Sequence, residues 1–72
     1  MNTIKIKGEY IKLDSLLKFA AVVASGGEAK EAITENLVKV NGEVCTMRGK
    51  KIHPGDTVEF LGNKISVAAD ES

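Results

Sequence analysis

The chain has 72 residues, with ten basic and ten acidic side chains, so its formal net charge is zero. This balance disfavours an indiscriminate polyanion binder, and the length leaves little room for a deep catalytic pocket. One cysteine excludes an internal disulfide, and the longest apolar block, Phe19 to Ala24, is too short to cross a bilayer. We therefore expect a single cytoplasmic domain over residues 1–72, with no metal, cofactor, membrane or small-molecule partner.

The first third of the chain predicts a strand followed by a helix. Thr3 to Lys7 alternates apolar and charged residues and indicates a half-buried strand. Tyr10 to Leu13 continues extended and leads to Asp14, a good N-cap for a helix from Ser15 to Ala24. Apolar residues cover most of this helix, so we expect it to be buried, with Phe19 in the core.

A second helix is predicted directly after the first. Ser25 is its expected N-cap, and Glu28 stands three residues on, as in a capping box. The helix runs roughly from Glu28 to Asn36, with Leu37 expected to point inward. Asn36 tolerates the left-handed conformation that ends many helices.

The remainder of the chain predicts short antiparallel strands. Asn41-Gly42 after Val38-Lys39-Val40 is a strong signal for a hairpin with a type I′ turn. The later segments follow in this order: a strand Glu43 to Met47, a basic connection Arg48 to Lys51, a turn His53 to Asp56, a strand Thr57 to Leu61, a turn at Gly62-Asn63, a strand Lys64 to Val67 and a frayed end Ala68 to Ser72. The predicted fold is α+β, with the two helices packed on a small, mainly antiparallel sheet.

The basic residues are concentrated in a few segments. Between Val38 and His53 the chain carries Lys39, Arg48, Lys50 and Lys51 against one acidic residue. With Lys12 and Lys18 at the first helix, these side chains predict a basic groove that contacts phosphates.

The start of the second helix is a further candidate site. Glycines at 26 and 27 expose backbone amides at a helix N-terminus, where an anion is favoured, and Lys30 lies one turn on. The alternative is that Gly26 and Gly27 only form a sharp turn and that Ser25 satisfies the amides. The carboxylate of Glu28 would repel a phosphate there. The sequence leaves both interpretations open.

Residues for stacking and catalysis are scarce. The aromatic residues are Tyr10, Phe19 and Phe60, which disfavours recognition of single strands by an aromatic platform. His53 has no evident partner for acid–base catalysis, and Cys45 on a predicted strand suggests packing. We therefore expect no catalytic residues.

Five short motifs occur in a specific order. They are Lys12-Leu13-Asp14, Ser25 with Ala29-Lys30, Ile33 to Leu37, Val38-Lys39-Val40-Asn41-Gly42 and Pro54-Gly55-Asp56-Thr57-Val58. Over about Tyr10 to Phe60 this set resembles the alpha-L RNA-binding motif, named after small-subunit ribosomal protein S-four. It departs from that pattern at Gly26, where many relatives carry an arginine, and at Asn36, where a glycine is usual.

The resemblance implies a non-enzymatic module for structured RNA, either ribosomal RNA or tRNA, with the ribosome as a candidate partner. We expect the protein to be a monomer. Its RNA-binding residues would be Lys12, Lys18, Ser25, Gly26, Gly27, Lys30, Lys39, Asn41, Arg48, Lys50 and Lys51. The alternative is a protein-interaction domain that pairs an exposed sheet edge with a partner strand, with the basic residues only solvated.

Overall fold

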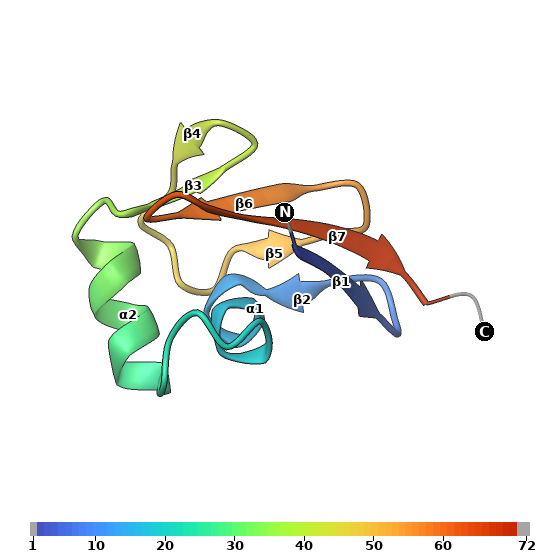
Figure 1. The fold of residues 1–72 in the computed structure, drawn as a ribbon, viewed down its shortest axis with the longest axis horizontal. Helices are drawn as coiled ribbons and strands as arrows, with labels where there is room; N and C mark the ends of the chain where they lie inside the picture. Colours follow the sequence, from blue (N-terminus) through green and yellow to red (C-terminus); the bar gives the residue numbers. More distant parts are fainter. Residues whose placement is uncertain (1, 71–72) are drawn as a thin grey trace.

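The computed structural model describes residues 2–70, and within this range the chain forms two helices and seven strands (Figure 1). In chain order these are β1 (Asn2–Ile6), β2 (Ile11–Lys12), α1 (Leu13–Phe19), α2 (Gly26–Thr34), β3 (Val38–Val40), β4 (Glu43–Val44), β5 (Lys51–Ile52), β6 (Thr57–Phe60) and β7 (Asn63–Ala69).

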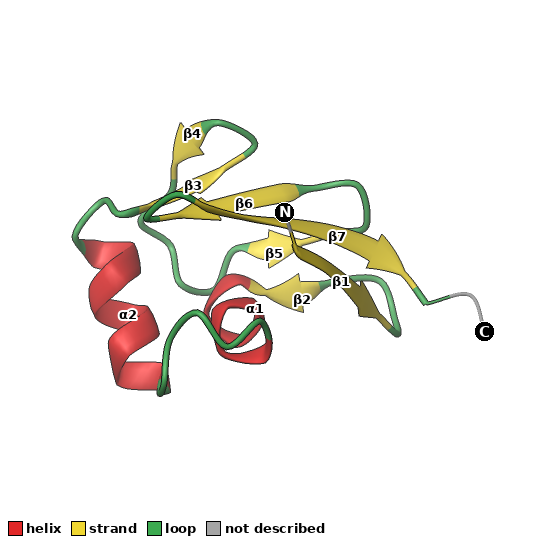
Figure 2. Ribbon diagram, in the orientation of Figure 1, coloured by secondary structure: helices red, strands yellow, loops and turns green. Residues whose placement is uncertain are grey.

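The strands form a five-stranded sheet and a separate two-stranded ladder (Figure 2). The larger sheet has the order β1-β7-β6-β3-β4. In this sheet β1 and β7 are parallel, and all other neighbouring strands are antiparallel. The smaller ladder pairs β2 with β5. The predicted α+β fold with a mainly antiparallel sheet is therefore confirmed.

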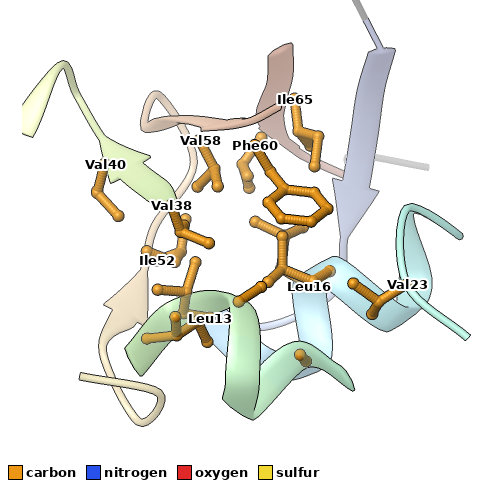
Figure 3. Packing of buried hydrophobic residues seen from close by; sticks show 14 of the residues in the cluster. Leu13, Leu16, Val23, Val38, Val40, Ile52, Val58, Phe60 and Ile65 are labelled. Carbon is orange, nitrogen blue, oxygen red and sulfur yellow. The ribbon is translucent and has the colours of Figure 1, made fainter. Parts of the chain in front are cut away.

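The core lies between the two helices and the inward positions of the strands. Figure 3 shows these side chains pointing toward one another from both helices and from β3, β5, β6 and β7. Alternate residues of β6, Val58 and Phe60, are buried, as period-two patterning requires. Phe60 thus belongs to the core. The prediction that Phe19 lies in the core is wrong, because its side chain is 65% exposed.

Phe19 is exposed because α1 ends there and does not continue to Ala24. The amide of Val22 donates to the Leu17 carbonyl at 3.2 Å and that of Ala21 donates to the Lys18 carbonyl at 3.0 Å. With Ala21 at φ 59°, these bonds form a Schellman motif that closes the helix. The predicted length of the helix was therefore wrong.

The N-terminus of α1 also differs from the prediction. Lys12 occupies the N-cap position without a side-chain capping bond, while Asp14 lies in the first turn and accepts from the Ser15 amide at 2.8 Å. The helix begins early because β2 leads straight into it, and the amide of Leu13 donates to the carbonyl of Lys50 at 2.9 Å.

α2 begins two residues before the predicted start but has the predicted cap. The Ser25 hydroxyl oxygen accepts from the Glu28 amide at 3.3 Å, and the Glu28 carboxylate accepts from the Ala24 amide at 2.7 Å. The carboxylate therefore bonds one residue earlier than in a standard capping box. Asn36 is left-handed, at φ 63°, as expected for this end. The inward prediction for Leu37 is wrong, because it is exposed just past that turn.

The first hairpin is confirmed, and the second differs by one residue. Asn41 and Gly42 have φ values of 52° and 87°, and Val40 pairs with Glu43, which gives the predicted type I′ turn. In the second hairpin Phe60 pairs with Asn63, so the turn residues are Leu61 and Gly62 and not the predicted Gly62-Asn63.

β1 and β6 differ by one residue from the predicted limits, and the larger differences are in β4, β5 and β7. β4 ends at Val44, and β5 forms where a basic connection was expected. β7 continues to Ala69 because its end pairs with β1, so the expected fraying of Ala68 and Ala69 is wrong. The last two residues of the predicted frayed end lie outside the described range.

Candidate functional site

Four cations from distant parts of the sequence meet at the β2–β5 ladder. Lys12 of β2 lies directly opposite Lys51 of β5. The preceding segment is held against the start of α1, since the Leu13 amide donates to the Lys50 carbonyl and the Asp14 amide to the Arg48 carbonyl at 3.2 Å. We name this set the β2–β5 basic cluster: Lys12, Arg48, Lys50 and Lys51.

The side chains of this cluster are available to a ligand. All four residues are exposed. Within residues 2–70 the recorded ion pair joins His53 and Asp56, at 3.9 Å, and none of the four cations is paired with a carboxylate. No ion pair within the described residues therefore neutralises these charges, although Lys50 lies near enough to Asp56 to lower its pKa.

A hollow of about 650 Å³ lies beside the cluster, between the β3–β4 hairpin and β5. Lys50, Lys51 and His53 contribute to its lining from the β5 side. Glu43 and Asp56 also line it, so its charge is mixed. The hollow thus offers both cations and carboxylate oxygens to a ligand.

The hairpin wall is held in place by Asn41 and Asp56. The Asn41 Nδ2 donates to Asp56 Oδ1 at 3.1 Å, and Asn41 Oδ1 accepts from the Thr57 amide at 2.9 Å. The other carboxylate oxygen of Asp56 accepts from the His53 amide at 2.8 Å. Both ends of the Asn41 amide are thus engaged within the chain. That Asn41 also contacts RNA stays a prediction.

These contacts set the protonation of Asp56. The hydrogen bond from the His53 amide lowers the pKa of Asp56 below its usual 3.8, and partial burial opposes the shift. The Asn41 bond and the nearby charges of His53 and Lys50 lower the pKa further. Asp56 is therefore held as an acceptor.

The junction between the helices holds a second group of predicted residues. The side chain of Lys18 reaches Gly26, where its Cδ lies 4.0 Å from the position a Cβ would take. Lys30 stands four residues after Gly26 and so shares its helix face. Ser25, Gly26, Gly27 and both lysines are exposed. The Ser25 hydroxyl oxygen already accepts a hydrogen bond from the Glu28 amide, so this amide is satisfied within the chain, as the alternative interpretation of the segment expects.

Lys39 lies apart from both groups. Its neighbours Val38 and Val40 are buried, so alternation places Lys39 on the face of the sheet that points away from the core. In the strand register Lys39 lies opposite Glu59 of β6. Lys39 is absent from the lining of the β3–β4 hollow. The structure does not bring it to the β2–β5 basic cluster.

The sequence did not predict that Tyr10 contacts Lys51 of β5 and the nearby His53. The Lys51 Nζ lies 5.0 Å from the centroid of the Tyr10 ring, and the rings of Tyr10 and His53 are 6.2 Å apart. Each strand of the β2–β5 ladder has only two residues, too few to show a period in the sequence. Without that pairing, nothing connects Tyr10 with Lys51.

Within residues 2–70, no helix is long and apolar enough to span a bilayer. No group of three or more His, Cys, Asp or Glu side chains is placed there to hold a metal ion.

Known proteins match almost the whole chain. Residues 4–68 match the family model of the S4 domain. The chain is 46% identical over 61 residues to a Bacillus subtilis (strain 168) protein named probable ribosome maturation protein RlbA, covering 85% of this chain and 86% of the relative. It is 43% identical over 63 residues to the Escherichia coli (strain K12) putative RNA-binding protein YbcJ, covering 88% and 90%.

A solved structure matches as well. The solution structure of Escherichia coli YbcJ, described as revealing an alfaL motif involved in RNA-binding, superposes with a TM-score of 0.75 at 41% identity. The match covers 96% of this chain and 89% of that one.

Proposed function

The chain belongs to the S4-domain family, as the resemblance of its motifs indicated, and we propose that it is an RNA-binding module that holds structured RNA through the β2–β5 basic cluster. The observation that carries the proposal is the convergence of Lys12, Arg48 and Lys50–Lys51 through the strand register and the two backbone hydrogen bonds to α1.

The physical basis is neutralisation of phosphates by exposed cations. Each lysine or arginine that meets a phosphate releases counterions, so the affinity falls as salt rises. Arg48 adds a planar group that can bind phosphate or guanine through two hydrogen bonds. A rigid group of such cations suits the fixed phosphate spacing of a folded RNA.

The relatives favour ribosomal RNA over tRNA as the target. One is named as a ribosome maturation protein and another as an RNA-binding protein. Lys18, Ser25–Gly27 and Lys30 would then extend the contact toward the helix junction. We leave Lys39 out of the proposed surface, because it lies on the other face of the sheet.

The test is the binding of a folded ribosomal RNA fragment at several salt concentrations, measured by fluorescence anisotropy. The wild-type logarithm of affinity should fall linearly with the logarithm of salt. Changing Lys12, Arg48, Lys50 and Lys51 together to Gln should reduce that slope by about 3 to 3.5, at about 0.7–0.9 per lost phosphate contact.

Lys39→Gln is the matched control, since it removes one exposed positive charge from the opposite face. Its slope should stay close to that of the wild type. Absence of wild-type binding at low salt, or equal slopes in the fourfold variant and Lys39→Gln, would contradict the proposal.

A further inference from the structure

A second hollow, of about 400 Å³, is lined in part by Tyr10 and Ile11, which directly precede Lys12 of the β2–β5 basic cluster. Its lining includes three partly or fully exposed apolar side chains, those of Tyr10, Ile11 and Phe19. Phe19 is 65% exposed and Tyr10 is 40% exposed, so two of the three aromatic rings of the chain face this one hollow.

Positive charge surrounds these rings. Lys5 and Lys7 line the same hollow, and Asp70 contributes one carboxylate to it. The Lys51 Nζ lies 5.0 Å from the Tyr10 centroid, so Tyr10 stands between the hollow and the basic cluster. An aromatic surface next to phosphate-binding cations is the chemistry that holds an unpaired nucleotide.

We propose that this hollow binds an unpaired RNA base, stacked on Tyr10, while the β2–β5 basic cluster holds the phosphates of the adjoining stem. The proposal rests on the proposed function. It assigns Tyr10 as a specificity residue that distinguishes a stem with an unpaired nucleotide from a continuous duplex.

The charges favour a nucleotide over an apolar protein segment in this hollow. A nucleotide brings a flat base and a phosphate together, and the Tyr10 ring lies beside the Lys51 cation. Lys5 and Lys7 place further cations at the hollow. A purely apolar segment would bring no negative charge to a hollow that two lysines and one carboxylate line.

Tyrosine fluorescence reports on this site alone, because the chain has one tyrosine and no tryptophan. The probe is a stem–loop RNA with unpaired adenosines in its loop, compared with the same stem as a blunt duplex. Stacking predicts that the stem–loop quenches Tyr10 fluorescence more strongly than the duplex at equal occupancy. Anisotropy of labelled RNA gives the occupancy.

Two substitutions separate stacking from other roles of the ring. Tyr10→Leu keeps an apolar side chain and removes the aromatic face, and it should weaken stem–loop binding about tenfold more than duplex binding. Tyr10→Phe keeps the face and should restore stem–loop affinity to near the wild-type value. If Tyr10 only positioned Lys51, Tyr10→Leu would weaken both RNAs equally, which would overturn the proposal.

The result also distinguishes failure of the two proposals. If wild-type protein binds neither RNA, the proposed function fails and the stacking site with it. If it binds both RNAs in a salt-dependent way but shows equal quenching and no selective effect of Tyr10→Leu, the stacking site alone is refuted. Circular dichroism of each variant establishes that the comparison is between folded proteins.

Discussion

At the residue scale, the most informative pair is Asn41 and Asp56, because it joins two of the motifs that identify the family. The Asn-Gly motif forms the hairpin turn and the Gly-Asp motif precedes β6, and the side chains of the two motifs bond to each other at 3.1 Å. Thr57 and His53 complete the network through their backbone amides. We interpret this pair as a latch that fixes the hairpin beside the basic cluster.

If the Asn41–Asp56 pair stabilises the fold, protonation of Asp56 should lower the free energy of unfolding in acid. Because the pKa of Asp56 is lower in the folded chain than its usual 3.8, the unfolded chain takes up the proton first as pH falls. The stabilisation is therefore present above about pH 4 and is lost as pH falls through the folded-state pKa. Asp56→Asn should be less stable by about 1–3 kcal/mol at neutral pH, and this gap should narrow in acid.

Urea denaturation at a series of pH values measures the gap. Glu9→Gln, which removes an exposed carboxylate from the turn before β2, is the control, and its curve should follow that of the wild type. A gap between Asp56→Asn and wild type that stays constant from neutral to strongly acid pH would contradict the latch.

At the element scale, both helices end in the same way but with different residues. Asn36, two residues after the end of α2, has φ 63°, a conformation that asparagine accepts readily. Ala21, two residues after the end of α1, has φ 59°, where its Cβ is strained. The bond from the Val22 amide to the Leu17 carbonyl holds Ala21 in that conformation.

Relief of this strain should stabilise the chain. Ala21→Gly removes the strained Cβ at an exposed position, so we expect a gain of about 0.5–1 kcal/mol after the larger entropy loss of glycine is subtracted. The free energy of unfolding from urea titration measures it. The matched control is Ala24→Gly, also exposed but without positive φ, which should not stabilise. A lower free energy of unfolding in Ala21→Gly than in the wild type would contradict the interpretation that Ala21 is strained.

The same two helix ends show how far sequence reasoning reached. Asn36, the Asn41-Gly42 turn and the Ser25 cap carry local signals, and the structure confirms each of them. The end of α1 carries none, because Ala20 to Ala24 has apolar residues that suit a continuing helix equally well. Tertiary packing decided it: Val23 is buried in the core, whereas Phe19 is not.

The sequence indicated which basic residues could belong to the candidate site, but it did not show how the fold arranges them. The motif order identified the family, and the basic residues were visible as charges. Their convergence depends on β2 and β5, which are long-range partners of two residues each. Lys39 was grouped with the other cations because it is near them in sequence, yet strand alternation turns it away. The ring contact of Tyr10 depends on the same hidden ladder.

At the scale of the whole molecule, the chain has zero net charge, and two exposed groups of cations lie at the two ends of α1. One is the β2–β5 basic cluster, and the other is Lys18 with Lys30 at the helix junction. α1 connects them, since it begins directly after Lys12 and carries Lys18 in its last turn. A single helix of seven residues is about 10 Å long, so one RNA can contact both of its ends.

If one RNA spans both groups, their contributions should combine. Changing Lys18 and Lys30 to Gln should reduce the salt slope of RNA binding by about 1.5, at about 0.7–0.9 per contact. When these two changes are added to the fourfold cluster variant, the slope should fall by the sum of the separate effects, because distant contacts act independently. Salt titrations of the three variants on one RNA measure this. A slope that Lys18 and Lys30 leave unchanged would confine the interface to the β2–β5 basic cluster and leave the glycines of the helix junction as a turn.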